Sequence, residues 1–483
     1  MDSKNLALLT DLYELTMMQG YFSAGAVDKE CIFDMFYRKN PSHNGYAVFA
    51  GLSQVIEYIK NLKFSEDDIS YLKSLNLFTS GFLGYLQGYK FTGDIYAVKE
   101  GAVVFPNEPL IVVKANIMEA QLIETAILNI INHQSLIATK ASRVCFSSGG
   151  DIVLEFGLRR AQGPDAGIYG SRAAVIGGCN ATSNVLAGRM FDIPVRGTHA
   201  HSWVMSFDSE ITAFREYAKA FPDTCIFLVD TYDTIKSGVP NAIKVLDELK
   251  AAGQLPKSYG IRLDSGDLAY LSKTARSMLD SAGYQGAIIS ASGDLDEYLI
   301  ESLKLQGAQI TTWGVGTNLI TSADWPAFGG VYKLAAEKGE DGSYTPKIKI
   351  SENTAKVTNP GVKKIYRLYD KKHNKMKADL ITLSHEKINE NEDLVIFDPN
   401  DTWKRMTLKA NEFTAEELLA PIFIKGACIY ETPSVMEIRE YCIQQKNTLW
   451  DEYKRNLNPH VMPVDLSQEL YDLKQELIGK HRG

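Results

Sequence analysis

The sequence lacks any apolar run long enough to cross a membrane. The longest uninterrupted run covers residues 418–424 and contains Pro421, whereas a membrane-spanning helix needs about 20 apolar residues. The opening residues, MDSKN, show no basic patch followed by a long apolar stretch, so we expect no secretory signal and no membrane partner. With 45% hydrophobic and 23% charged residues, the composition excludes a disordered or fibrous chain.

Cysteine is scarce and shows no metal-binding pattern. The six cysteines form no C-x-x-C pair and have no histidines at zinc spacing; they stand at positions 31, 145, 179, 225, 428 and 442. In a chain of 483 residues this scatter predicts reduced, buried thiols and a cytoplasmic protein, and it argues against a disulfide framework.

An excess of basic residues is also missing, because the net charge is 51 − 59 = −8. Nucleic-acid-binding surfaces need clustered Lys and Arg to release counterions from phosphates, so we expect no nucleic acid partner. A small anionic ligand still fits, since one pocket needs only a few local cations. A Walker-type Gly-Lys-Ser/Thr sequence is absent as well, which excludes a P-loop.

Short apolar, β-branched segments recur through the middle of the chain. They cover residues 152–156, 175–178, 193–196, 226–229, 259–263, 287–290, 310–313 and 331–335. Amphipathic stretches with helical periodicity separate most of them, at residues 210–220, 242–252, 268–282 and 295–306. Strand–helix alternation with strands that are apolar throughout favours a parallel sheet, and eight strands favour an irregular (β/α) barrel. An open, doubly wound sheet remains the alternative.

Both ends of the chain depart from this rhythm, which predicts an α/β protein of three domains. Residues 1–140 mix helical and strand patterns and are predicted to form an N-terminal α/β cap. Residues 141–340 would form the barrel with the active site. Residues 341–483 are more polar and end in two helical patterns; we expect a C-terminal α+β portion packing on cap and barrel.

Polar side chains follow the predicted strands, where barrel enzymes place their chemistry. Gly314-Val315-Gly316-Thr317 exposes backbone N–H groups beside a hydroxyl, an arrangement suited to a phosphate, and Gly293 with its neighbour Ser292 would share the same anion. Arg159, Arg160 and Arg262 stand at the ends of other predicted strands, where an acidic ligand would meet them. The alternative for the glycine segment is a tight turn, and the alternative for the three arginines is a set of structural ion pairs.

Two histidines, His199 and His201, lie two residues apart after the strand at 193–196. Because no third ligand is near, a nucleophile or proton shuttle suits them better than zinc. Asp264 and Asp267 suit ribose hydroxyls or a hydrated Mg²⁺. These residues fit phosphoryl or phosphoribosyl transfer without choosing between them.

Six motifs, in this order along the chain, resemble those of the nicotinate phosphoribosyltransferases, a family of type II phosphoribosyltransferases. They are LLTDLYELTM at 8–17, EFGLRR at 155–160, ATSN at 181–184, GTHAHS at 197–202, RLDSGD at 262–267 and GVGT at 314–317. The resemblance implies joining of nicotinate to phosphoribosyl pyrophosphate in NAD salvage. It further implies ATP hydrolysis through a phosphohistidine, Mg²⁺ accompanying the pyrophosphate through ligands that the motifs leave unidentified, and a homodimer with shared active sites.

The resemblance also implies roles for individual residues. His201 would be phosphorylated, with Thr198 in the same loop, and Asp264 would hold ribose hydroxyls. Phe156 and Tyr13, the latter from the partner subunit, would stack on the pyridine ring. The remaining assignments concern charged and phosphate groups: Arg262 for the nicotinate carboxylate, Arg159 for the anionic substrate, and Gly293, Gly314, Gly316 and Thr317 for the 5′-phosphate.

Related activities are less well matched. A nicotinamide-specific enzyme would carry an Asp that suits the carboxamide, where this chain has Thr182-Ser183-Asn184. A quinolinate-specific enzyme needs more basic residues and has no phosphorylated His. From other classes, a non-catalytic sensor has no use for a phosphorylatable His, and an aldolase needs a Schiff-base lysine, for which Lys333 is the candidate.

Overall fold

The computed structural model describes residues 5–353 and 356–482. Its contacts group the chain into two compact units. Unit 1 comprises residues 1–136, 327–433 and 440–483, and unit 2 comprises residues 137–326 and 434–439. Helices α6 (Glu124–Ser147) and α15 (Val435–Thr448) contribute residues to both. The three-domain division drawn from the sequence stays a prediction.

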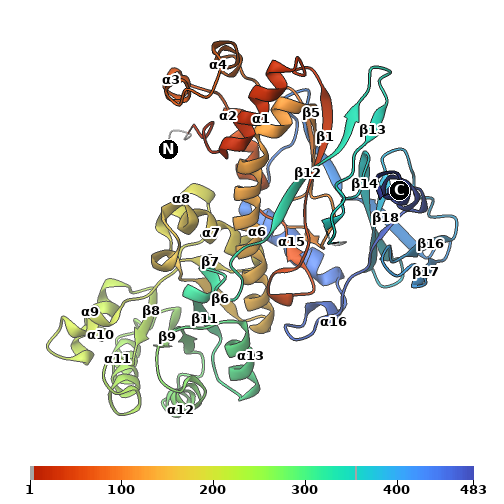
Figure 1. Cartoon of the computed structure of the whole chain (residues 1–483). Helices are drawn as coiled ribbons and strands as arrows, with labels where there is room; N and C mark the ends of the chain where they lie inside the picture. Colours follow the sequence, from red (N-terminus) through yellow and green to blue (C-terminus); the bar gives the residue numbers. More distant parts are fainter. Residues whose placement is uncertain (1–4, 354–355, 483) are drawn as a thin grey trace. The chain divides into compact units, whose positions relative to one another are not determined.

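Unit 2 is built on a six-stranded, fully parallel sheet in the order β7-β6-β11-β10-β9-β8. Its strands are β6 (Ile152–Glu155), β7 (Ala181–Thr182), β8 (Thr224–Leu228), β9 (Ser258–Leu263), β10 (Ile288–Ala291) and β11 (Thr312–Val315). Helices lie around this sheet (Figure 1). This is an α/β fold as predicted, but β7 and β8 are its edges among the described residues, so a closed eight-stranded barrel is not confirmed.

Several helices of unit 2 start at a polar N-cap residue that ends the preceding loop. Ser209, Asp267 and Asp296 each accept a backbone N–H from the first turn of α10, α12 and α13, a contact typical of helix starts. The elements are η2 (Leu158–Arg160), α7 (Pro164–Gly177), α8 (Val185–Phe191), α9 (His201–Met205), α10 (Glu210–Ala220), η3 (Thr234–Gly238), α11 (Val239–Ala251), α12 (Leu268–Ser281), α13 (Glu297–Leu305) and α14 (Thr317–Ile320).

Three predicted strands are corrected by the structure. Residues 175–178 belong mostly to α7, whose Val175 and Ile176 are fully buried; a short apolar run does not distinguish a buried helix from a strand. The segment at 193–196 forms only an isolated bridge between Val195 and Thr182. The strand at 331–335 exists as β12 (Gly330–Lys338), but it pairs antiparallel with β1 in unit 1.

Unit 1 contains a seven-stranded sheet in the order β13-β12-β1-β5-β3-β19-β20, with every neighbouring pair antiparallel. The strands are β1 (Glu30–Tyr37), β3 (Asp94–Val98), β5 (Ile111–Asn116), β12 (Gly330–Lys338), β13 (Tyr344–Pro346), β19 (Leu419–Ile424) and β20 (Ala427–Cys428). A separate pair joins β2 (Ala47–Val48) to β4 (Val103–Val104). The helices are α1 (Leu12–Ser23), η1 (Pro41–His43), α2 (Leu52–Asn61), α3 (Glu66–Ser74), α4 (Ser80–Gln87), α5 (Ile117–Leu122), α16 (Asp451–Lys454) and α17 (Gln468–Arg482).

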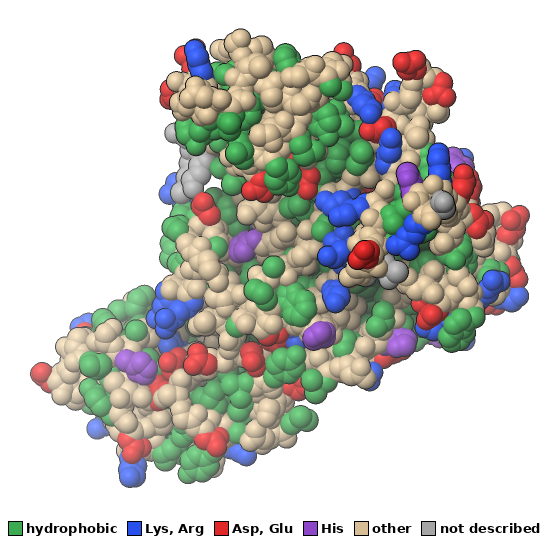
Figure 2. Space-filling model, in the orientation of Figure 1, with side chains coloured by type: hydrophobic (Ala, Val, Ile, Leu, Met, Phe, Trp, Pro, Cys, Tyr) green, Lys and Arg blue, Asp and Glu red, His purple; other side chains and the backbone are tan. Residues whose placement is uncertain are grey.

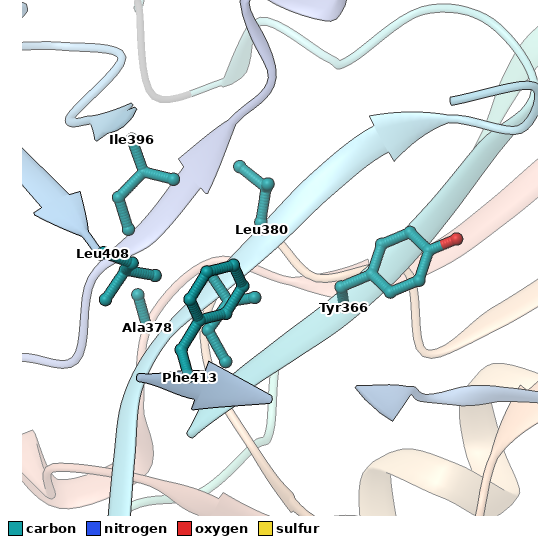
Figure 3. Close-up of a cluster of buried hydrophobic side chains, with 7 residues drawn as sticks. Tyr366, Ala378, Leu380, Ile396, Leu408 and Phe413 are labelled. Atoms are coloured by element: carbon teal, nitrogen blue, oxygen red, sulfur yellow. The ribbon is translucent and has the colours of Figure 1, made fainter. Parts of the chain in front are cut away.

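A second sheet of unit 1 has its own hydrophobic core. Its order is β18-β14-β15-β21, formed by β14 (Lys363–Asp370), β15 (Lys375–Leu383), β18 (Phe413–Glu417) and β21 (Val464–Leu466). Leu368, Leu380 and Phe413 pack there with residues of the hairpin β16 (Leu394–Phe397)–β17 (Arg405–Leu408) (Figure 3). Burial of these apolar side chains stabilises the hairpin, which has no other sheet partner among the described strands.

No helix in the described part of the chain is long and apolar enough to span a bilayer. Acidic and basic side chains are intermingled on the face drawn in Figure 2. The cations of a binding site must therefore be identified from local geometry.

Candidate functional site

The predicted site residues of unit 2 follow the carboxyl ends of neighbouring parallel strands. Arg262 is on β9, Ser292 directly follows β10, Gly314 is on β11 and Phe156 directly follows β6. These four strands are consecutive in the sheet. Because parallel strands end at the same edge, side chains far apart in the sequence meet there.

Arg262 is the centre of this group. Its Nε donates to the Ser292 hydroxyl at 3.0 Å, and its NH1 donates to the Thr198 hydroxyl and, at 3.2 Å, to the His199 carbonyl. Its NH2 lies 3.4 Å from Asp264 Oδ1. The side chain is 15% exposed, so the guanidinium is held in a fixed orientation with one N–H of NH2 left over for a ligand.

Asp264 is held as an anion by its neighbours. Burial alone would raise its pKa, but hydrogen bonds from Ser292 and Arg262 and the charge of Arg262 lower the pKa below its ordinary value. The backbone N–H of Asp264 donates to Asp230 Oδ2 at 2.9 Å, and Ser265 donates to the same oxygen at 2.7 Å. An ionised carboxylate with fixed orientation can accept hydrogen bonds from sugar hydroxyls.

His201 is the first residue of α9, and its side chain is 40% exposed. Its Nδ1 lies 3.1 Å from the hydroxyl of Thr231, and its Nε2 lies 3.8 Å from Asp264 Oδ2. The imidazole therefore has one nitrogen engaged by a neutral hydroxyl and the other facing the ribose-binding candidate. The Thr231 contact was not predicted, because Thr231 follows a different strand, β8, 30 residues away.

His199 is built differently from His201. Its ring is buried, and its Nε2 accepts the backbone N–H of Leu228 at 3.2 Å. The other nitrogen, Nδ1, therefore carries the hydrogen and donates to the Ala200 carbonyl at 3.4 Å. The pKa of His199 is lowered to about 4, chiefly by burial and also by the charge of Arg262, while the bond to Ala200 opposes the shift. His199 is a neutral ring that fastens the loop to β8.

Phe156 and the predicted phosphate loop are in close contact. A Cβ added at Gly314 would lie 2.6 Å from the Phe156 ring, and one at Gly293, whose φ is +95°, would lie 2.2 Å from the Asp264 carbonyl oxygen. Only glycine fits at position 293 without a backbone shift, whereas a Cβ at position 314 would displace the Phe156 side chain. Asn318 donates to the carbonyls of Asp294 at 2.9 Å and Leu295 at 3.3 Å, which ties the loops after β10 and β11 together.

Glu155 directly precedes Phe156 at the end of β6 and was given no role in the sequence analysis. It is fully buried and accepts hydrogen bonds from the Gly157 N–H, from Ser171 at 2.9 Å and from Thr182 at 2.6 Å. Burial raises its pKa, and these three bonds oppose the rise. Thr182 belongs to the stretch 182–184 where a nicotinamide-specific enzyme would carry an Asp, and its hydroxyl is engaged with Glu155. The sequence did carry a signal for Glu155, since a charged residue within an otherwise apolar strand is unusual.

The other predicted residues lie as follows. Thr198 bonds Arg262, while Gly316 and Thr317 stand at the start of the four-residue helix α14. Arg159 is exposed on η2. Tyr13 belongs to unit 1 and is 48% exposed. In the described residues there is no cluster of three or more His, Cys, Asp or Glu that would hold a metal ion by itself.

The chain matches family models along most of its length. Residues 8–132 match the N-terminal domain of nicotinate phosphoribosyltransferase, residues 152–373 the nicotinate phosphoribosyltransferase family, and residues 362–474 the C-terminal domain. A nicotinate phosphoribosyltransferase of Bacillus subtilis is 49% identical over 474 residues, which covers 98% of this chain and 95% of the relative. The protein belongs to the nicotinate phosphoribosyltransferase family.

Two further comparisons agree with this membership. A nicotinate phosphoribosyltransferase of Caenorhabditis elegans is 37% identical and covers 99% of this chain and 94% of its own length. The crystal structure of human nicotinic acid phosphoribosyltransferase matches with a TM-score of 0.84 and 28% identity, covering 97% of this family member and 99% of the human chain. The family fold therefore extends over both units, including the C-terminal residues that contributed no motif.

Proposed function

We propose that this protein transfers the phosphoribosyl group of phosphoribosyl pyrophosphate to nicotinate. The products would be nicotinate mononucleotide and pyrophosphate, in the salvage of NAD. The observation that carries the proposal is the fixed constellation of Arg262, Asp264 and His201 at the carboxyl edge of the parallel sheet, in a member of this family. A cation for a carboxylate and an anion for ribose are groups that this reaction needs, and a phosphorylatable ring would serve its coupling to ATP.

The chemistry requires orientation more than proton transfer. The pyridine nitrogen is unprotonated near neutrality, so it attacks the anomeric carbon directly while the C–O bond to pyrophosphate breaks through an oxocarbenium-like state. Arg262 has one N–H free to donate to the nicotinate carboxylate. If the carboxylate is bound through two N–H groups, the 3.4 Å bond between Arg262 NH2 and Asp264 must open. Phe156 offers a face for the ring, with Tyr13 of a partner subunit on the other side in a homodimer with shared sites.

We further propose that ATP hydrolysis is coupled through His201. Its Nε2 would attack the γ-phosphorus, forming an N–P bond as ADP leaves, and water would later release phosphate from the phosphoramidate. Phosphorylation of His201 would place a second negative charge beside that of Asp264, and this added charge would favour the pyrophosphate-bound state. Nδ1 is occupied by Thr231, which leaves Nε2 as the acceptor.

Mg²⁺ would accompany the pyrophosphate. The side chain of Asp230 fits a magnesium ion, because its Oδ1 is a buried oxygen with no hydrogen-bond partner among the described residues. The other oxygen of the same carboxylate, Oδ2, accepts the backbone N–H of Asp264. Mg²⁺ prefers oxygen ligands and keeps several waters, so one or two carboxylates and substrate phosphates suffice. When bound, the ion would neutralise charge on the departing pyrophosphate.

The test is incubation with nicotinate, phosphoribosyl pyrophosphate, Mg²⁺ and ATP, followed by measurement of nicotinate mononucleotide and pyrophosphate. Nicotinamide and quinolinate in place of nicotinate serve as matched controls. Absence of pyrophosphate release with nicotinate would refute the transferase proposal. For the coupling, His201→Ala should abolish ATP hydrolysis and acid-labile phosphate on the protein, and phosphate retained by this variant would refute the role of His201.

A further inference from the structure

A buried ion cluster within unit 2 consists of Lys140, Arg143, Glu297 and Asp324. Lys140 and Arg143 lie one turn apart on α6, and their side chains are 3% and 1% exposed. Glu297 is 0% exposed, and Asp324, at 34%, closes the cluster toward the surface. The two positive and two negative charges cancel, which lowers the cost of removing them from water. None of the four takes part in the proposed chemistry, so another role has to explain them.

Each cation of the cluster contacts both carboxylates. Lys140 Nζ donates to Glu297 Oε1 at 3.0 Å and to Asp324 Oδ1 at 2.6 Å. Arg143 NH2 lies 2.8 Å from Glu297 Oε1, and Arg143 NH1 donates to Asp324 Oδ2 at 3.2 Å. Arg143 NH2 also donates to the hydroxyl of Tyr298 at 2.6 Å. These contacts fix the positions of Glu297 and Asp324 relative to α6 and to each other.

The two carboxylates stand at the far ends of the two predicted phosphate loops. The loop after β10 contains Gly293 and ends at Glu297, the first residue of α13. The segment after β11 begins with Gly316, forms α14 and reaches Asp324 four residues after that helix ends. Because β10 and β11 are neighbouring parallel strands, both loops leave the same edge of the sheet. The ion cluster therefore ties the ends of both loops to one helix.

Short-range hydrogen bonds connect Asp324 to the start of α14. The backbone N–H and the hydroxyl of Thr321 donate to the Thr317 carbonyl at 3.1 and 2.7 Å. The backbone N–H of Ala323 donates to the Asn318 carbonyl at 3.2 Å. The side chain of Asn318 in turn bonds the loop after β10. A displacement of Asp324 would therefore be transmitted to Thr317 and to the separation of the two loops.

We propose that the buried ion cluster positions these two loops to bind the 5′-phosphate of phosphoribosyl pyrophosphate. The inference rests on the proposed function, in which Thr317 and the glycines of the loops hold that phosphate. Backbone N–H groups bind a phosphate well when they converge on it, and groups from two loops converge only if the loops are held at a fixed separation. Buried ion pairs often add little stability relative to apolar side chains, but their bonds are directional. The four side chains are positioning residues that act through the loop backbone.

The test compares two ligands that differ only in the 5′-phosphate, nicotinate mononucleotide and nicotinate riboside. The ratio of their dissociation constants, measured by equilibrium titration, reports the contribution of the phosphate site. Asp324→Asn keeps the shape of the side chain and removes its charge. We expect the preference for the mononucleotide to fall about threefold to tenfold in this variant, with riboside affinity nearly unchanged. The KM for phosphoribosyl pyrophosphate should rise by a similar factor, while the KM for nicotinate stays nearly constant.

Lys304→Met is the matched control. Lys304 lies on the same helix α13, and its Nζ forms an ion pair with Asp151 at 2.7 Å. Asp151 precedes β6, so this pair is at the amino edge of the sheet, away from the phosphate loops. The variant should keep the wild-type preference for the mononucleotide and the wild-type KM for phosphoribosyl pyrophosphate.

A double variant separates positioning from stability. Lys140→Met together with Asp324→Asn removes one positive and one negative charge, so Arg143 still balances Glu297. The thermal unfolding temperature of the double variant should therefore exceed that of Lys140→Met alone. Its preference for the mononucleotide should stay low, because Asp324 no longer has its ionic tether. If Lys140→Met does not fold, Asp324→Asn decides alone.

A wild-type preference for the mononucleotide in Asp324→Asn, or equal weakening of both ligands, would overturn the inference. The same conclusion would follow if Lys304→Met lowered the preference as much, or if the preference recovered with stability in the double variant. A wild-type protein that binds the mononucleotide no more tightly than the riboside would instead refute the proposed phosphate site. The two failures are therefore distinguishable.

Discussion

The Nδ1 atom of His201 lies 3.1 Å from the hydroxyl of Thr231. This contact joins the start of α9 to the residue that follows Asp230 after β8. A ring with one nitrogen held in this way presents the other nitrogen in a fixed direction, and here that nitrogen faces Asp264 at 3.8 Å. The geometry makes Thr231 a positioning residue for His201.

We predict that Thr231→Val slows phosphorylation of His201. Loss of one hydrogen bond worth about 0.5–1.5 kcal/mol corresponds to a reduction of roughly twofold to tenfold. The measurement is the single-turnover rate of labelled phosphate incorporation from ATP. Thr231→Ser keeps the hydroxyl and should retain most of the rate; equal rates for the valine variant and the wild type would contradict the prediction.

A pH effect on stability is expected from His199. Its folded-state pKa of about 4 lies below the ordinary value of 6.5, so the unfolded chain binds more protons between these pH values. Stability attributable to His199 is therefore complete above pH 6.5 and declines as the pH falls toward 4, by up to about 3 kcal/mol.

The variant His199→Gln should show a flatter decline of thermal unfolding temperature between pH 7 and 4 than the wild type. His481→Gln, at an exposed position of α17, provides the comparison. A wild-type slope in His199→Gln would show that His199 does not titrate in this way.

Arg262→Lys should weaken nicotinate binding while keeping the positive charge. Lysine cannot bond Ser292, Thr198 and a carboxylate together, since it lacks the planar fork. We expect the KM for nicotinate to rise by about 10- to 100-fold, as for hydrogen bonds to a charged group worth about 1.5–3 kcal/mol. Arg215→Lys alters a bidentate surface pair with Glu248 and should have no effect on KM. Similar KM values for both variants would refute a direct role of Arg262.

Gly314→Ala should displace the Phe156 ring, because the added Cβ would lie 2.6 Å from it and 3.4 Å from the Ser292 Cβ. We expect a higher KM for nicotinate, of about tenfold, corresponding to roughly 1.4 kcal/mol of lost ring contact. Steady-state kinetics measure it. Gly84→Ala, where no atom lies within 4 Å of the new Cβ, should leave KM unchanged. If Gly314→Ala binds nicotinate normally, Phe156 does not contact the ring.

Local sequence was sufficient to identify much of unit 2. The strands β6, β8 and β9 were found because they are short and apolar between polar loops, and α10 was found because Glu210–Ala220 has helical periodicity. The motifs identified the family and marked Arg262, Asp264 and His201 as candidate site residues. Both kinds of signal are carried by adjacent residues.

Contacts between residues distant in the sequence were decided only by the tertiary structure. The segment at 331–335 is a strand, as predicted, but its partner β1 lies some 300 residues earlier, so its sheet could not be read from the segment itself. The Thr231–His201 and Lys140–Glu297 contacts likewise join separate elements. The sequence by itself determined which residue types are available to the site. Packing of the chain decided which of them are buried, and hence which histidine stays neutral, because desolvation acts only on groups that folding removes from water.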